Sequence, residues 1–346
     1  MFSEQAYQAA RHRAAAIERV DRGLIVVSGQ DRASYLQGLL TNDIARLTAG
    51  EGCYAAYLTP QGRMIADALV YELGDVILMA VPLPHTASVL AKLDQLVFGE
   101  DVRLGDVTAT FSRYAVIGPA TAAVLHTVLG EGSTDLESLP EHGNRRVRFG
   151  GHPSVLTRVD EAGEPGFDLY VERSQREALQ EAIRAAGVPF VDAETADVIR
   201  IEAGIPKFDQ DMDQDTIPLE AGIEGRAISF SKGCYVGQEV IVRVVHRGHG
   251  RVARKLAGLA LEGPDLPIAG AAVTADGRQV GRVTSSAHSP ALGRPIALAY
   301  LHRDALEAGT VVSVNGARAV VTTLPFVEPA KVFESARRLP AETEGS

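Results

Sequence analysis

Apolar residues recur at helical spacing in several stretches of the chain. Four of them, between residues 35 and 40, follow Asp31, a residue type that caps helix N-termini, and predict a short helix. Further segments combine helical periodicity with a start or stop signal: the segment after Pro84, residues 119–129, the segment opened by a capping box of Ser174 and Glu177, and residues 193–203.

Runs of β-forming residues predict strands between these helices. Residues 54–58 and 63–73 flank Pro60-Gln61-Gly62, which predicts a strand, a turn and a second strand. Residues 130–165 are rich in Gly, Glu and Ser and predict a loop with one strand, 147–159.

Two hairpin signals distinguish the last part of the chain. Asp276-Gly277 and Asn315-Gly316 join short β-rich segments, and both dipeptides favour the positive φ of two-residue hairpin turns. Residues 252–326 are therefore predicted to form a small antiparallel, barrel-like unit.

Helices mixed with antiparallel strands predict an α+β fold instead of a doubly wound sheet. We expect residues 1–250 to form two interleaved α+β domains, residues 251–328 a C-terminal β-barrel domain, and residues 329–346 a polar tail. No glycine-rich phosphate loop follows a strand, which argues against a nucleotide enzyme.

Composition narrows the class of protein. Apolar residues make up 46% of the 346 residues and charged residues 23%, as in ordinary globular proteins. The net charge of −10 argues against direct nucleic-acid or anionic-lipid binding by the overall field. The N-terminal segment lacks the apolar core of a signal peptide, and the longest apolar run, residues 76–81, is far short of a membrane span. We expect a cytoplasmic monomer that does not enter a membrane.

Two patterns imitate metal sites. Four aspartates alternate between residues 209 and 215, with Glu220 at the position of a calcium loop's bidentate ligand, but Gln214 stands where such a loop needs glycine. His246 and His249 lack a third ligand at a defined spacing. We therefore predict a solvated acidic loop, a basic strand end and no metal site.

Asp67 is the first candidate for chemistry. A period of two along residues 63–73 places it on one strand face with Ile65, Leu69 and Tyr71. Either the carboxylate is buried and hydrogen-bonded, as at many functional sites, or it is solvated on an exposed edge strand. The pattern alone leaves both alternatives open.

The second candidate is Cys234, which lies between two glycines and two residues after Lys232. A neighbouring cation lowers the pKa of a thiol and so favours the nucleophilic thiolate, which predicts an exposed, working thiol. The alternative is an incidental cysteine in a loop. Cys53 precedes an alternating segment and is predicted to be a small buried hydrophobe. Residues 240–261 contain no acid and several basic residues, which indicates a local anion site.

Residues 232–239, Lys-Gly-Cys-Tyr-Val-Gly-Gln-Glu, resemble the KGCYxGQE signature of the YgfZ proteins. These are folate-binding relatives of the glycine cleavage T-protein, implicated in the maintenance of iron–sulfur enzymes and, through them, in tRNA modification. Further segments resemble the family and extend the likeness over roughly residues 20–326: residues 31–43, 60–63, 200–206 and 218–221.

The resemblance implies three domains around a central cavity that receives tetrahydrofolate or a one-carbon derivative. Asp67 matches the aspartate that contacts the folate as presumed acid or base in the relatives, although Ala66 stands where T-proteins commonly have a second aspartate. Asp168, in the segment 163–168, matches the carboxylate that holds the pterin. Together with the signature these segments give the expected cofactor-binding set: Asp67, Asp168, Glu202, Lys232, Tyr235, Gln238 and Arg243.

Two functional hypotheses follow from the resemblance. The first is a folate-binding accessory protein for iron–sulfur enzymes, including those that modify tRNA, with Cys234 as the catalytic thiol. Its partners would be these enzymes or their assembly factors, and it is preferred here because T-proteins lack the signature cysteine. The alternative is a folate-dependent aminomethyltransferase of the T-protein type with Asp67 as its catalytic base. Direct RNA binding through residues 243–255 has support only from charge.

Overall fold

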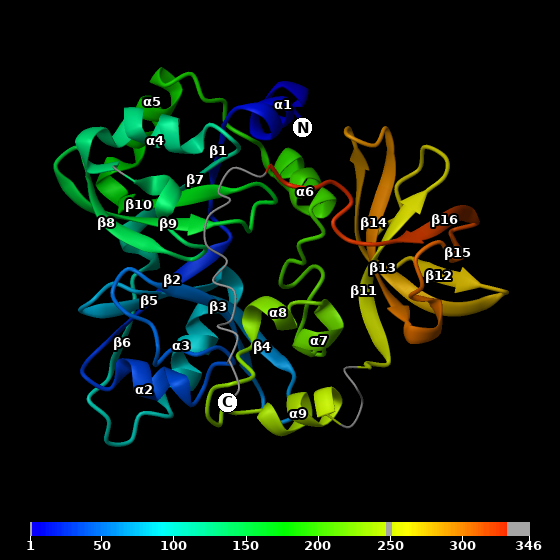
Figure 1. Ribbon diagram of the computed structural model, residues 1–346, viewed down its shortest axis with the longest axis horizontal. Helices are drawn as coiled ribbons and strands as arrows, with labels where there is room; N and C mark the ends of the chain where they lie inside the picture. Colours follow the sequence, from blue (N-terminus) through cyan, green and yellow to red (C-terminus); the bar gives the residue numbers. More distant parts are fainter. Residues whose placement is uncertain (1, 134, 247–250, 331–346) are drawn as a thin grey trace, which may run out of the picture.

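Two antiparallel five-stranded sheets and a closed barrel make up the computed structural model, which describes residues 2–133, 135–246 and 251–330 (Figure 1). The strands of the first sheet lie in the order β1 (Ala15–Glu18), β7 (Phe111–Ile117), β10 (Gly166–Glu172), β9 (His152–Val159) and β8 (Asn144–Phe149). Those of the second sheet lie in the order β3 (Gly52–Leu58), β4 (Met64–Glu72), β5 (Val76–Pro82), β2 (Arg22–Ser28) and β6 (Arg103–Asp106).

Each sheet buries one face against helices, and parts of the other faces pack against each other. Helices α2 (Arg32–Gln37) and α3 (Thr86–Asp94) pack their apolar residues on the second sheet, and α4 (Thr121–Leu129) and α5 (Arg176–Ala185) pack on the first. The inner faces share one core, in which Tyr71 of β4 meets Tyr170 of β10 edge to face at 6.4 Å between ring centroids. Strands buried on both faces explain the near-continuous apolar runs in the sequence.

The barrel confirms the prediction for the C-terminal part of the chain. Its strands close in the order β11 (Arg254–Leu261), β14 (Arg294–His302), β13 (Arg278–Ser289), β12 (Ala272–Ala275), β15 (Val311–Val314) and β16 (Ala317–Thr322). Asp276-Gly277 and Asn315-Gly316 form its two tight turns, with φ of 49° and 73° in the first and 51° and 84° in the second. The predicted α+β fold with a C-terminal antiparallel barrel is confirmed.

The remaining helices connect the sheets to the barrel. They are α1 (Glu4–His12), α6 (Ala193–Glu202), α7 (Pro218–Ala221), α8 (Glu224–Ala227) and α9 (Gln238–His246). Helices α1 and α6 lie between the first sheet and the barrel and share a core with both (Figure 1). In the described ranges, none of the helices combines the length and the apolar character that crossing a bilayer takes. The predicted polar tail falls almost wholly on residues 331–346, outside the described residues.

Two local predictions were wrong. The single strand predicted over 147–159 is a hairpin of β8 and β9, because Gly150 and Gly151 turn the chain with φ of 56° and 83°. The predicted capping box does not form, since α5 begins at Arg176 and the Ser174 hydroxyl donates to the Glu172 carboxylate at 3.5 Å.

Glu202, a predicted folate ligand, lies where α1, α6 and the barrel meet. Its carboxylate is fully buried and accepts hydrogen bonds from Arg11, Ser289 and the Tyr7 hydroxyl, the last at 2.8 Å. Arg11 also pairs with the buried Glu164. A single guanidinium thus compensates two buried carboxylates at the junction.

We predict that Arg11→Met destabilises the fold by roughly 3–5 kcal/mol, because it leaves Glu164 and Glu202 buried without their cation. Urea unfolding measures the loss. Arg13→Met is the control, because Arg13 lies two residues away and its side chain is exposed. It should lower the free energy of unfolding by less than about 0.5 kcal/mol. Equal stabilities of the two variants would contradict this role of Arg11.

Candidate active site

Asp67 is buried in the interior of the second sheet. Strand β4 lies between β3 and β5, and the Asp67 side chain is 2% exposed. Its carboxylate accepts two hydrogen bonds from Arg22, at 3.3 Å and 2.8 Å, and one from the Tyr54 hydroxyl at 2.9 Å. Of the two alternatives left open by the sequence, the buried and hydrogen-bonded carboxylate is therefore correct.

The strand face of Asp67 differs in one residue from the prediction. Leu69 and Tyr71 share the inner face with Asp67, but Ile65 packs in the outer core. A β-bulge opposite Tyr57 shifts the register, so that Met64 takes the inner position. A strict period of two cannot detect such a bulge.

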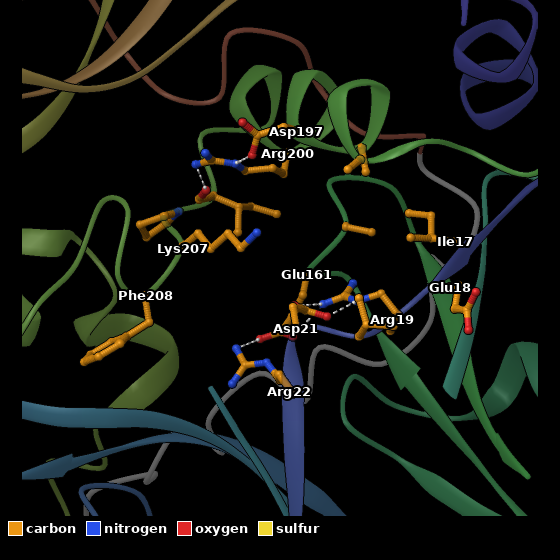
Figure 2. A pocket seen from close by; sticks show the side chains of 16 residues that line it. Ile17, Glu18, Arg19, Asp21, Arg22, Glu161, Asp197, Arg200, Lys207 and Phe208 are labelled. Atoms are coloured by element: carbon orange, nitrogen blue, oxygen red, sulfur yellow. Dashed lines mark hydrogen bonds and ion pairs between the residues drawn. The ribbon is translucent and has the colours of Figure 1, made fainter. Parts of the chain in front are cut away.

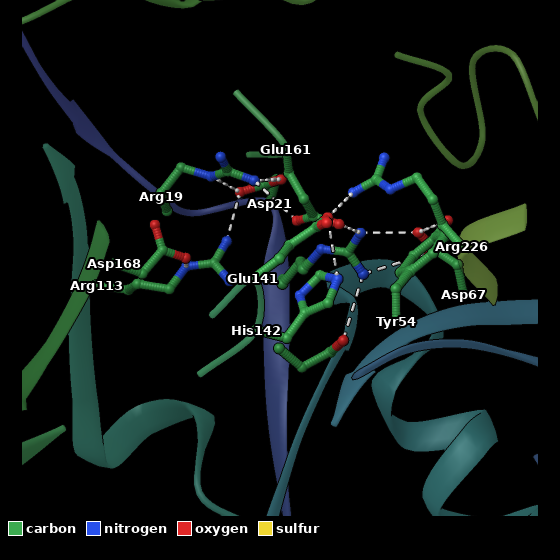
Figure 3. Close-up of polar contacts among 12 residues, drawn as sticks. Arg19, Asp21, Tyr54, Asp67, Arg113, Glu141, His142, Glu161, Asp168 and Arg226 are labelled. Carbon is green, nitrogen blue, oxygen red and sulfur yellow. Dashed lines mark hydrogen bonds and ion pairs between the residues drawn. The ribbon is translucent and has the colours of Figure 1, made fainter. Parts of the chain in front are cut away.

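A chain of alternating charges connects Asp67 to Asp168, on the other sheet (Figure 3). Its members, in order, are Asp67, Arg22, Glu161, Arg19, Asp21, Arg113 and Asp168, and the successive contacts are 2.8, 3.0, 3.6, 3.1, 2.9 and 3.6 Å. The members come from β4, the β1–β2 connection, β2, the β9–β10 connection, β7 and β10. We call these seven residues the charge chain.

Burial and neighbouring charges affect the acids of the charge chain differently. Burial by itself would raise the pKa of Asp21 and Glu161, but neighbouring guanidiniums outweigh burial and lower both pKa values: chiefly Arg19 and Arg113 for Asp21, and chiefly Arg22 and Arg19 for Glu161. Burial raises the pKa of Asp168, and Arg113 offsets only part of that effect. Neither oxygen of the Asp168 carboxylate accepts a hydrogen bond within the described residues. Asp168 therefore has unused capacity to bind N–H donors.

A cavity of about 190 Å³ lies beside the charge chain, between the two sheets and α6, and we call it the central cavity (Figure 2). Arg19, Asp21, Arg22 and Glu161 line one side. The other side is lined by residues of α6 and of the segment after it, among them Asp197, Arg200, Lys207 and Phe208. Asp67 and Asp168 do not line this cavity: Asp67 lies behind Arg22, and Asp168 is connected to the cavity wall only through Arg113 and Asp21. Cations and carboxylates on the wall suit a polar ligand with both donors and acceptors.

Comparisons with known proteins identify the family of this chain. A family model described as the GCVT N-terminal domain matches residues 2–232, and one described as the glycine cleavage T-protein C-terminal barrel domain matches residues 254–328. The chain belongs to the glycine cleavage T-protein family. This confirms the coarser part of the sequence resemblance.

Relatives of the T-protein family match nearly the whole chain. An aminomethyltransferase of Geobacillus kaustophilus is 33% identical over 95% of this chain and 91% of its own length, and one of Streptomyces avermitilis is 31% identical over 92% and 87%. The crystal structure of glycine cleavage system aminomethyltransferase T from Bartonella henselae superposes with a TM-score of 0.83 at 24% identity, covering 94% of this chain and 89% of that one. The T-protein fold is thereby established.

Lys232, the first residue of the signature, has a structural role in this protein. Lys232 is 9% exposed, and its ammonium donates to the carbonyl oxygens of Gln37, Leu40 and Asn42 at 2.6, 2.6 and 2.8 Å. It thus binds carbonyls at and beyond the C-terminal end of α2. Burial lowers the pKa of Lys232 to about 8. The Lys232 ammonium also lies 5.0 Å from the centroid of the Tyr235 ring, which is itself buried.

Two further residues of the signature loop, residues 232–237, differ in their surroundings. Gly237 has φ of 84° and lies against the β3–β4 turn, where an added Cβ would lie 2.5 Å from the Thr59 carbonyl oxygen. Cys234, in contrast, is exposed and does not line the central cavity. Cys53 is buried, as predicted, and burial raises its pKa to about 12.

The structure brings only part of the predicted site together. Asp67 and Asp168 share the charge chain, whereas Glu202 lies at the barrel junction. The rest of the set lies in the signature loop and α9: Lys232, Cys234, Tyr235, Gln238 and the exposed Arg243. Arg19, Asp21, Arg22, Arg113 and Glu161 were not predicted, because isolated charges in connections and at strand ends carry no periodic signal.

The predicted absence of metal sites remains a prediction. Within the described ranges, no three His, Cys, Asp or Glu side chains lie together as a metal site would require. Asp211, one of the alternating acids, is buried and paired with Arg200. The prediction of a solvated acidic loop was therefore wrong for this residue. His249 and part of the basic segment lie outside the described residues.

We predict that Gly237→Ala destabilises the protein by about 1–3 kcal/mol, since alanine is strained at this φ and its Cβ meets the Thr59 carbonyl. Gly233→Ala is the matched control in the same loop, because nothing lies within 4 Å of its added Cβ. Thermal unfolding of both variants tests the difference. If both melt at the wild-type temperature, the close packing of the loop on the turn is refuted.

Proposed function

We propose that this protein binds a tetrahydrofolate at the central cavity and uses it in one-carbon transfer of the aminomethyltransferase type. One observation carries the proposal. Asp67 and Asp168, which the family resemblance assigns to the folate, come from different sheets and end in one charge chain beside the cavity. The relatives named aminomethyltransferase, at up to 33% identity over nearly the full length, support the same activity.

The chemistry of the cavity suits the pterin end of a folate. A reduced pterin offers several N–H donors and a carbonyl acceptor on one ring system, and the wall offers carboxylates and guanidiniums within hydrogen-bond reach of each other. Phe208 adds an aromatic surface. At about 190 Å³ the cavity is smaller than the ~300–1,000 Å³ of sites that enclose a drug-sized ligand. It would enclose one end of the folate, with the glutamate end outside.

Tetrahydrofolate supplies the nitrogen that carries the one-carbon unit. The charge chain would bind and orient the ligand, and its far end is the Asp168 carboxylate, which is paired with Arg113 but accepts no hydrogen bond within the described residues. Asp67 would supply a fixed negative charge, held by Arg22 and Tyr54. With these residues the site would bind a polar ligand that is rich in N–H groups in preference to an apolar one.

We predict that Asp67→Asn weakens tetrahydrofolate binding by about tenfold or more, the effect of losing a charged hydrogen bond. Isothermal titration calorimetry measures the affinity. Glu72→Gln is the matched control, since Glu72 is also a buried carboxylate of β4 held by an arginine, Arg32, but lies outside the cavity. Equal affinities of Asp67→Asn and wild type would remove Asp67 from the site.

A second function is supported by Cys234. In the signature loop Lys232, Tyr235 and Gly237 each make contacts that hold the loop, whereas Cys234 is exposed. An exposed thiol in a loop this well anchored suits a chemical role, as in the YgfZ proteins that the signature resembles. This candidate is a folate-binding accessory protein for iron–sulfur enzymes, and it shares the folate site with the first.

The two functions differ in their dependence on Cys234. If Cys234 is the working thiol, Cys234→Ser should keep the fold and the folate affinity but fail to restore iron–sulfur enzyme activity in cells that lack the protein. Cys53→Ser should instead lower stability, because it puts a hydroxyl into a buried position.

Complementation at matched protein levels, run beside a glycine cleavage assay of the purified protein, separates the candidates. Aminomethyl transfer that Cys234→Ser leaves intact supports the transferase. Full complementation by Cys234→Ser rules out the thiol mechanism.

A further inference from the structure

Arg22 stands between Asp67 and the central cavity. Its guanidinium lines the cavity wall, whereas Asp67 does not line it and is 2% exposed (Figure 2). One oxygen of Asp67 already accepts from both Arg22 and Tyr54, at 2.8 and 2.9 Å, and the other accepts from Arg22 at 3.3 Å. A ligand in the cavity therefore meets the arginine before it can meet the aspartate.

The guanidinium of Arg22 is fixed in orientation by its partners. It forms a two-pronged pair with Asp67 on β4, and it donates to the Ala80 carbonyl oxygen of β5 at 3.3 Å. It thus spans three neighbouring strands, since Arg22 itself begins β2. A planar fork held in this way can direct a hydrogen bond, which a flexible ammonium cannot do.

The remaining partner of Arg22 is Glu161, which lies in the connection between β9 and β10 of the first sheet and lines the cavity. The Arg22 guanidinium donates to the Glu161 carboxylate at 3.0 Å, and Arg19 pairs with its second oxygen at 3.6 Å. The Glu161 side chain is 9% exposed. Two arginines hold this carboxylate at the wall, and Glu161 is the acid of the charge chain that both lines the cavity and contacts Arg22 (Figure 2).

From these contacts we propose that Glu161 is the carboxylate that binds the ligand, and that Asp67 acts through Arg22 as a positioning residue for it. Arg22 transmits the effect of Asp67 across the gap between the sheets. The proposal rests on the proposed folate function for the identity of the ligand. It differs from a direct role of Asp67, because it makes the effect of Asp67 depend on Arg22.

A double-mutant cycle for binding tests this dependence. Calorimetry with tetrahydrofolate compares wild type, Asp67→Asn, Arg22→Lys and the double variant, with Glu161→Gln measured beside them. Glu161→Gln should lower the affinity about tenfold or more. Asp67→Asn should lower it by a similar factor in wild type but by less than about twofold in the Arg22→Lys background. Arg32→Lys is the matched control, since Arg32 forks onto buried Glu72 in the same sheet, at 3.2 and 3.1 Å, away from the cavity. It should leave the affinity unchanged.

Two results would overturn the proposal. One is an undiminished effect of Asp67→Asn in the Arg22→Lys background, and the other is wild-type affinity of Glu161→Gln. Urea unfolding supplies a readout that needs no folate. Asp67→Asn and Glu161→Gln should be non-additive by at least about threefold in the unfolding equilibrium constant, and additive once Arg22 is lysine. Additivity with Arg22 present refutes the link between the sheets. Absence of folate binding by the wild type refutes the proposed function alone, and the unfolding cycle then decides the inference.

Discussion

Compensation of buried charge between the two sheets is the constraint on which the site depends. The charge chain puts four carboxylates and three guanidiniums into a largely buried space, and each arginine contacts two acids. Burial of any of these ions without a partner of opposite charge would cost a large desolvation free energy. Removal of one member therefore leaves its neighbours buried without that compensation. The alternation therefore fixes how the sheets approach each other and keeps a polar wall beside the cavity.

The same constraint explains what the sequence could and could not predict. Local signals were sufficient for the barrel, where Asn315-Gly316 sets a turn by its backbone preference. For Asp67, whose strand is apolar on both faces, they left a buried and a solvated carboxylate as alternatives, and only the neighbouring strands decide between them. Arg22 and Glu161 were out of reach, because each is a single charge at the end of a strand or in a connection. Their importance arises only when residues 139 positions apart meet across two sheets. Tertiary contact, not pattern, creates this part of the site.

The signature loop shows how a motif can mix architecture with chemistry. Lys232 binds carbonyls at and beyond the end of α2, and Gly237 permits contact with the β3–β4 turn, so two of its residues are explained by packing. The predicted cofactor role of the loop has no contact with the cavity to support it, since neither Lys232 nor Tyr235 lines it. Cys234 remains the residue of the loop with an exposed reactive group. The proposed folate binding and the proposed thiol chemistry would thus involve different parts of the molecule.

The crystal structure of the protein with bound tetrahydrofolate is the measurement that tests the central claim most directly. The account predicts electron density for the pterin in the central cavity, within hydrogen-bond distance of Glu161 and beside Arg22. Two results would contradict this claim. One is density for the ligand at any other place. The other is a cavity without ligand density in crystals grown at a tetrahydrofolate concentration that saturates the protein in calorimetry.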